Sequence, residues 1–154
     1  MAYAVTVQTA APRILAAVHR QVTVGEVAKA FAPALDQVWA FLRGHPGLRS
    51  DGHNVFLYHH ATGQPAAGLE VDFGVEVTRH FQAQGPIACV ETPAGRAAVV
   101  VHRGAYSGIG AAHAALHRWC SDHGELIGRC SWEIYGDHHD DQSKLETTIF
   151  YLLA

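Results

Sequence analysis

The spacing of hydrophobic residues predicts two amphipathic helices in similar surroundings. Apolar residues recur at i, i+3 and i+4 from Val27 to Leu42 and again from Ile109 to Cys120. Each run carries a Trp near its C-terminal end. Thr23 and Glu26 have the spacing of a capping box before the first helix, and Gly124 is expected to end the second helix.

The segments around these helices also repeat in order. One segment precedes each helix and two strand-like segments follow it. The matching pairs are residues 13–20 with 96–103, 54–58 with 131–135, and 69–77 with 145–153. We therefore predict an α+β fold built as a tandem pseudo-symmetric duplication of a strand–helix–strand–strand unit, with antiparallel sheets and the helices on one face. Chance similarity of two amphipathic helices is the alternative, and four elements matching in order argue against it.

The two copies are expected to form one domain over residues 1–154. Repeat 1 covers about residues 3–81 and repeat 2 about residues 87–154, with a short connection at Gln82–Pro86 between them. Neither copy could easily bury its own apolar faces, so the two should pack against each other.

Composition excludes several classes of protein. With 49% hydrophobic residues and a net charge of −3, the chain is not expected to be disordered. Eleven Lys and Arg against fourteen Asp and Glu leave no basic excess for a simple nucleic-acid binder. No apolar stretch approaches the ~20 residues of a membrane span, and no signal peptide is evident. Three cysteines without CxxC spacing fit reduced thiols, so a cytoplasmic location is expected.

Strand alternation indicates where polar groups gather. In residues 69–77 the odd-numbered positions are apolar, while Glu70, Asp72 and Glu76 point the other way. The apolar face must meet the helices, so the acidic face looks either to bulk water or into a groove between the copies. Residues 145–153 are apolar on both faces, which is typical of a strand that is doubly covered or lines a pocket.

The segment 131–135 carries the main chemical signal. Trp132 and Ile134 share one face, and Glu133 and Tyr135 share the other. If Trp132 and Ile134 pack under the helices, the opposite surface surrounds Glu133 with aromatic rings, namely Phe56, Tyr58, Tyr135 and Phe150. Such a site suits a flat or cationic organic molecule. The alternative is an exposed Glu between two amphipathic tyrosines on an outer face.

These residues resemble the GyrI-like superfamily, which includes gyrase-inhibitor-like proteins and the effector-binding domains of AraC-type and MerR-type regulators. The resemblance rests on the duplicated layout, on the segment from Pro93 to Tyr106, and on Trp132–Tyr135 followed by a terminal strand. It implies a ligand cleft between the two halves. In that cleft Glu133 would meet cationic aromatic drugs, and Tyr106 and Tyr135 would form walls. Glu70 and Asp72 are further candidates for ligand contact.

The resemblance leaves two functions open. The first is a binding protein for hydrophobic, often cationic aromatic compounds, which needs only the walls and one charge. The second is a hydrolase that opens cyclopropane rings, because some relatives look like such enzymes. Glu133 would then be the base, Tyr135 or Tyr106 the donor, and Glu70 a reserve acid. A third function, inhibition of a protein partner such as gyrase, rests on family analogy alone.

Other patterns support no further site. His113 and His117 have i, i+4 spacing but no third ligand, so they are assigned to a solvated helix face. His19 and His102 repeat at strand ends and are interpreted as structural. No metal and no cofactor are expected, and the expected partner is a small hydrophobic or cationic aromatic molecule, without nucleic acid or membrane. About a dozen residues precede the first matched segment, residues 13–20, too few for a helix-turn-helix, so a complete one-chain repressor is not expected.

Overall fold

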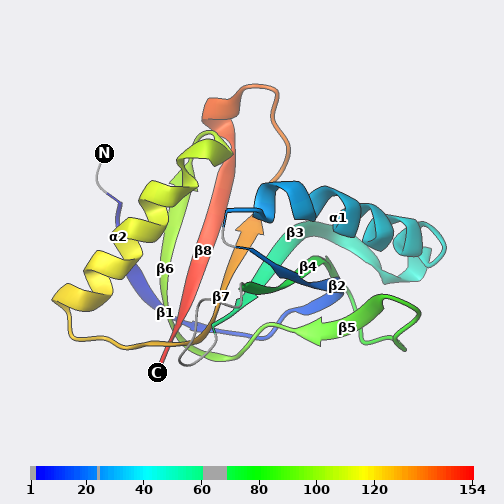
Figure 1. Ribbon diagram of the computed structural model, residues 1–154, viewed down its shortest axis with the longest axis horizontal. Coiled ribbons are helices and arrows are strands. Elements are labelled where there is room, and N and C mark those ends of the chain that lie inside the picture. The colour runs from blue at the N-terminus through cyan, green and yellow to red at the C-terminus, as the bar shows by residue number, and fades with distance from the viewer. Residues whose placement is uncertain (1–2, 24, 61–68) are drawn as a thin grey trace.

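The computed structural model describes residues 3–23, 25–60 and 69–154, and it leaves aside the side chains of 49–51. Within these residues eight strands form one antiparallel sheet and two α-helices lie against it, as the predicted α+β class requires (Figure 1). The strands are β1 (Thr6–Ala10), β2 (Ile14–Val22), β3 (Arg49–His59), β4 (Leu69–Val77), β5 (Ile87–Glu91), β6 (Gly95–Arg103), β7 (Ile127–Tyr135) and β8 (Glu146–Leu153). The helices are α1 (Val27–Arg43) and α2 (Ile109–Asp122), with short 3-10 turns at Pro46–Leu48, Tyr106–Gly108 and Gln142–Lys144.

The strand order is symmetric about the centre of the sheet. It reads β1-β6-β8-β7-β3-β4-β2-β5. The three strands of the first predicted repeat, β3-β4-β2, therefore run outward from the centre in the same order as the three of the second repeat, β7-β8-β6. At the centre β7 pairs with β3, and Phe56 lies opposite Glu133. The predicted order of strand, helix, strand and strand is present in each half. The sequence did not predict β1 and β5, which extend the two edges; the repeat bounds near 81 and 87 stay a prediction.

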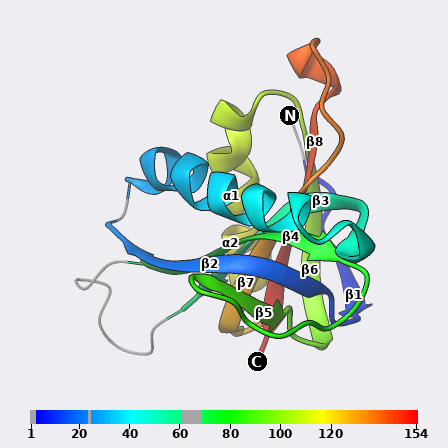
Figure 2. The ribbon, with the colours of Figure 1, turned by 90° about the vertical axis from the view of Figure 1, so that its right-hand side faces the viewer.

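Both helices cover the same face of the sheet, which we call the helix face. α1 packs on β2 and β4, and α2 packs on β6 and β8 (Figure 2). The N-terminal ends of the two helices approach each other near the centre of the sheet (Figure 1). α1 begins at Val27 as predicted, but the capping box does not form: Glu26 is the N-cap residue and makes no side-chain capping hydrogen bond. α2 is followed by Gly124 at φ +65°, as predicted.

The other side of the sheet, the reverse face, has an apolar core of its own. Trp132 stacks on Phe150 with ring centroids 5.2 Å apart, and Ile134 is buried in the same cluster. The connections from β1 to β2 and from β5 to β6 must cross from one edge of the sheet to the other. They meet where the Arg13 amide donates to Thr92 Oγ1 at 2.8 Å.

Trp132 and Ile134 therefore do not pack under the helices, and this corrects the sequence-based expectation. Both faces of the sheet are covered, so an apolar pair on β7 does not identify the helix side. The consequence is that Glu133 and Tyr135 point toward the helices.

Among the described residues, no helix is long and apolar enough to cross a bilayer.

Candidate ligand-binding site

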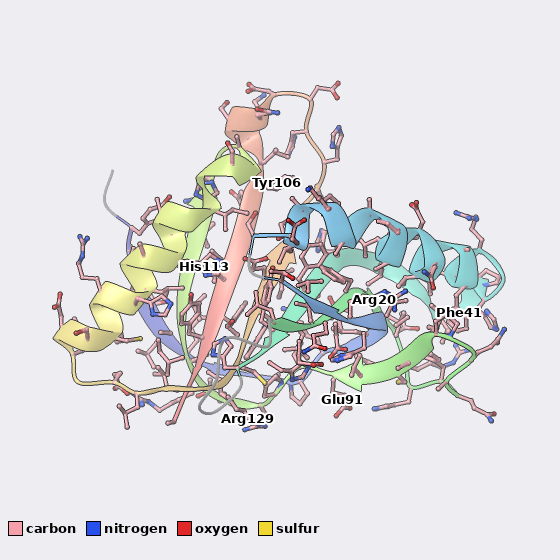
Figure 3. All side chains as sticks on the ribbon, viewed as in Figure 1. Arg20, Phe41, Glu91, Tyr106, His113 and Arg129 are labelled. Carbon is pink, nitrogen blue, oxygen red and sulfur yellow. The ribbon has the colours of Figure 1, made fainter. Side chains whose placement is uncertain are left out.

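A cavity of about 330 Å³ lies on the helix face, close to the N-terminal ends of the two helices. The first turn of α1 contributes Val27 and Ala28, and the start of α2 contributes Ile109. Phe31 and Tyr106 also line the cavity and are partly exposed to solvent. Figure 3 shows Tyr106 between the two helix ends. The remaining lining residues are Leu35, Asn54, Phe56, Tyr58, Glu133 and Tyr135. The volume falls in the range of ~300–1,000 Å³ that is usual for small-molecule sites.

Glu133 is the one charged side chain among the described residues of this lining, and only 4% of its surface is exposed. The hydroxyls of Tyr58 and Tyr135 donate to its Oε1 at 2.9 Å and 2.6 Å. His113 Nε2 lies 2.6 Å from its Oε2. A carboxylate offers about four lone-pair directions, so these three partners leave about one for a ligand or a water molecule.

The tyrosines are held in their protonated form. Burial, and next the negative charge of Glu133, raise the pKa of Tyr58 and of Tyr135 well above the usual value of a phenol. Both hydroxyls therefore remain donors throughout the neutral range. Their protons are committed to Glu133, which fixes the position of the carboxylate before any ligand arrives.

His113 extends this network to β8. Its Nδ1 lies 2.6 Å from the hydroxyl of Tyr151, and burial followed by the charge of Glu133 raises the pKa of Tyr151 above its ordinary value. In the neutral imidazole with hydrogen on Nε2, Tyr151 donates to Nδ1 and His113 donates to Glu133. Sequence reasoning placed His113 on a solvated helix face, and this was wrong. The available signal was that His113 lies four residues after Ile109, on the apolar stripe of α2.

Aromatic rings form the rest of the wall. Phe56 packs edge-on against Phe73 and lies 4.8 Å from the ring of Tyr135. Tyr106 meets Tyr135 edge-to-face at 5.3 Å and 89°. The Tyr106 hydroxyl has no hydrogen-bond partner among the described residues, which leaves it open to a ligand. Asn54, which sequence reasoning missed, lines the cavity with a buried Oδ1 that is unpaired within the described part of the chain.

The structure thus brings five of the predicted site residues together: Phe56, Tyr58, Tyr106, Glu133 and Tyr135. It separates the other three from them. Phe150 is on the reverse face against Trp132, because β8 is apolar on both faces and its alternation does not reveal which side lines the cavity. Glu70 and Asp72 also lie on the reverse face, where they hydrogen-bond to histidines. These three placements correct the expectation of a single shared wall.

Comparison with known proteins agrees with this architecture. The sequence matches the GyrI-like small molecule binding domain over residues 3–153. The search of curated protein sequences returned no match.

Three solved structures illustrate the shared fold. The EcmrR C-terminal domain is 22% identical with a TM-score of 0.80, and the match covers 100% of this chain and 99% of that one. SAV2435 bound to tetraphenylphosphonium is 13% identical with a TM-score of 0.74, over 100% and 94%. A hydrolase from Listeria innocua is 10% identical with a TM-score of 0.65, over 97% and 91%. With the family matched over almost its whole length, the chain belongs to the GyrI-like small molecule binding domain family.

Proposed function

We propose that this protein binds hydrophobic, cationic aromatic molecules in the cavity between the helices, with Glu133 as the charge anchor. One observation carries the proposal: a buried carboxylate, held by three hydrogen-bonding partners, lies at an aromatic-lined cavity. The described lining contains no Lys or Arg to compensate this charge. An organic cation would supply the missing positive charge, in a site from which much of the water is excluded.

The geometry of the walls supports the same ligand class. Phe56, Tyr106 and Tyr135 border the cavity, and aromatic rings attract both flat apolar groups and cations. The carboxylate needs no rearrangement on binding, because the tyrosine hydroxyls already orient it. SAV2435, which shares the fold, is seen with tetraphenylphosphonium, a cation with four aromatic rings.

Two ions of similar shape and opposite charge test the proposal. Calorimetric titration with tetraphenylphosphonium and with tetraphenylborate separates the contribution of charge from that of shape. We expect the wild-type protein to prefer the cation and Glu133→Gln to weaken cation binding by about tenfold or more, equivalent to ~1.4 kcal/mol. Asp140→Asn, which removes one exposed charge in the β7–β8 connection, should leave cation binding unchanged. Equal affinity of the wild type for both ions would refute the proposal.

A second candidate, hydrolysis of cyclopropane rings conjugated to a carbonyl, is favoured by one observation. His113 links Glu133 to Tyr151 in a continuous hydrogen-bonded chain. In this reaction Glu133 takes a proton from water while the water oxygen bonds to a ring carbon. The ring C–C bond breaks, and its electron pair moves toward the carbonyl oxygen, which takes a proton from a donor. Tyr106 is the better donor, since the Tyr135 hydroxyl is committed to Glu133.

Mass spectrometry decides between the two candidates. An alkylator with such a ring, incubated with the protein, should gain the mass of one water if the chain is a hydrolase. Glu133→Gln should then abolish turnover. Return of the unchanged compound after many hours by a protein that binds it would leave the binding function alone.

A further inference from the structure

The reverse face carries a second polar cluster, formed by His19, Asp72, His59 and Glu70. These residues come from three neighbouring strands: β2, β4 and β3. His19 pairs in register with Asp72, and His59 pairs with Glu70, so all four side chains fall within two adjacent rungs of the sheet. The cavity described above lies on the other face, with the sheet between them.

Asp72 is the centre of this cluster. Its side chain is 7% exposed, and its two oxygens bridge two imidazoles. His19 Nδ1 lies 2.7 Å from Oδ1, and His59 Nε2 lies 2.7 Å from Oδ2. Glu70 contacts the remaining ring nitrogen of His19. The cluster is open to solvent on one side, because the side chains of His19 and His59 are 50% and 40% exposed.

We propose that His19, His59 and Asp72 form a binding site for a divalent transition-metal ion of the zinc class. One ligand atom from each of the three residues lies within 4.8 Å of the others. Imidazole nitrogen and carboxylate oxygen bind Zn²⁺ at about 2.0–2.2 Å, and a tetrahedron of that size has edges of about 3.4 Å. The two imidazoles are half-exposed and can turn toward an ion, while Asp72 is held in its buried position. A water molecule completes the coordination, and Glu70 orients the His19 ring through its other nitrogen.

The surroundings favour a built site over scattered surface histidines. His53, His80 and His138 each face a single carboxylate, and such a pair offers only two ligands. Within the described residues, the His19 cluster is the group in which three ligand residues converge. Cys130 Sγ lies 3.8 Å from His59 Nδ1, so the nitrogen of His59 that faces away from Asp72 also has a neighbour that restrains the ring.

The bound ion would brace the first half of the sheet. It would join β2, β3 and β4 through side chains, in addition to their backbone hydrogen bonds. His59 is adjacent in sequence to Tyr58, whose side chain reaches Glu133 on the helix face. The ion would therefore restrain the strand that carries one wall of the cavity, without touching a ligand in it.

Metal titration of the purified, metal-stripped protein tests the site. We expect one Zn²⁺ per chain by calorimetry, and visible absorption typical of tetrahedral nitrogen and oxygen ligation when Co²⁺ is used. His59→Ala and His19→Ala should each weaken Zn²⁺ binding by about 100-fold or more, since loss even of an outer-shell partner weakens metal binding by ~10–100-fold. Zn²⁺ should raise the Tm of the wild type and not that of either variant.

The control is the double variant His138→Ala, His139→Ala, which removes two imidazoles from the β7–β8 connection. This variant should retain full Zn²⁺ binding. Circular dichroism and tetraphenylphosphonium binding verify that the His59 and His19 variants are folded. The proposal is overturned if zinc binding survives both variants, if it is lost in the control, or if no one-to-one binding occurs. If the cluster is only a network of hydrogen bonds, no one-to-one Zn²⁺ binding will be observed.

Discussion

His113 Nε2 and Glu133 Oε2 are 2.6 Å apart, although one residue belongs to α2 and the other to β7. The contact fastens the helix to the centre of the sheet through a charged group, in addition to the apolar packing of α2 on β6 and β8. Tyr151 extends it to β8 on the other side of the imidazole. The position of α2 beside the cavity is therefore linked to the same carboxylate that we propose as the ligand anchor.

Replacement of His113 should destabilise the fold. His113→Ala leaves the buried Glu133 carboxylate with two partners instead of three. Loss of a hydrogen bond to a charged group costs about 1.5–3 kcal/mol, so we expect a fall of that size in the free energy of unfolding, measured with urea. His117→Ala, one turn further along α2, removes only a ring contact with Tyr151 and should change stability by about 0.5 kcal/mol or less. Equal losses in the two variants would contradict the role of the contact.

Thr147→Val should make the protein more stable. Thr147 is fully buried, and its Oγ1 has no hydrogen-bond partner among the described residues. Removing an unpaired buried hydroxyl while keeping the shape of the side chain should raise the free energy of unfolding by about 1–2 kcal/mol. Thr148→Val, on the neighbouring position of β8, is the matched comparison and should have a smaller effect. A destabilised Thr147→Val would show that the hydroxyl is satisfied in solution.

Alkaline pH should unfold the protein through its buried tyrosines. Burial, followed by the Glu133 charge, raises the pKa of Tyr58, Tyr135 and Tyr151 above the value of ~10 that they have in the unfolded chain. The folded state then holds protons that the unfolded state releases. The stability due to these groups is present below pH ~10 and is lost as the pH rises above it.

Tyrosine absorbance and unfolding, recorded together between pH 9 and 13, check this prediction. Ionisation of the three buried tyrosines should coincide with unfolding. In Glu133→Gln the titration of these tyrosines in the folded state should begin at lower pH, since the neighbouring negative charge that raises their pKa is gone. Normal titration of all five tyrosines in the folded protein would be inconsistent with the network.

Two substitutions of Tyr106 separate the contribution of its ring to cation binding from that of its hydroxyl. Tyr106→Ala removes a partly exposed wall of the cavity and should weaken tetraphenylphosphonium binding about twofold to fivefold, as expected for an exposed cation–π contact of ~0.5–1 kcal/mol. Tyr106→Phe keeps the ring and should bind the cation within twofold of the wild type. Fluorescence titration measures both. If the chain is a hydrolase, Tyr106→Phe should slow turnover while this affinity is retained.

The sequence predicts the secondary-structure elements better than it predicts which face of the sheet each side chain points to. The alternation from Leu69 to Val77 gives β4 with its observed bounds and its helix-facing side, because one face is apolar and the other polar. Glu133 and Tyr135 are grouped correctly, but Trp132 is assigned to the wrong face. The burial of the reverse face could not be foreseen from local pattern, since its core joins residues of strands that are distant in sequence and depends on strand order. Phe150 is misplaced for the same reason.

Histidines are the other source of error. The segments around His19 and His102 match in sequence, yet His19 contacts Asp72 on the reverse face, and His102 is buried between Tyr3 and the carbonyl of Ala105. A histidine adapts to a polar surface, a buried hydrogen bond or a carboxylate partner, so its side of a strand cannot be deduced from residue type. The registers of β2 and of β3 with β4 bring His19, His59 and Asp72 together.

The outer strands determine when the chain can complete its fold during synthesis. Of the described strands β1 is made earliest, but its partner is β6, where Thr6 pairs with Val99. The first strand must therefore wait, unpaired, until most of the polypeptide has been made. Pairings between such distant segments are slow to form and leave an edge exposed to other chains in the meantime. Among the strands that the structure describes, β1 therefore waits longest for its first partner and stays longest open to wrong pairing.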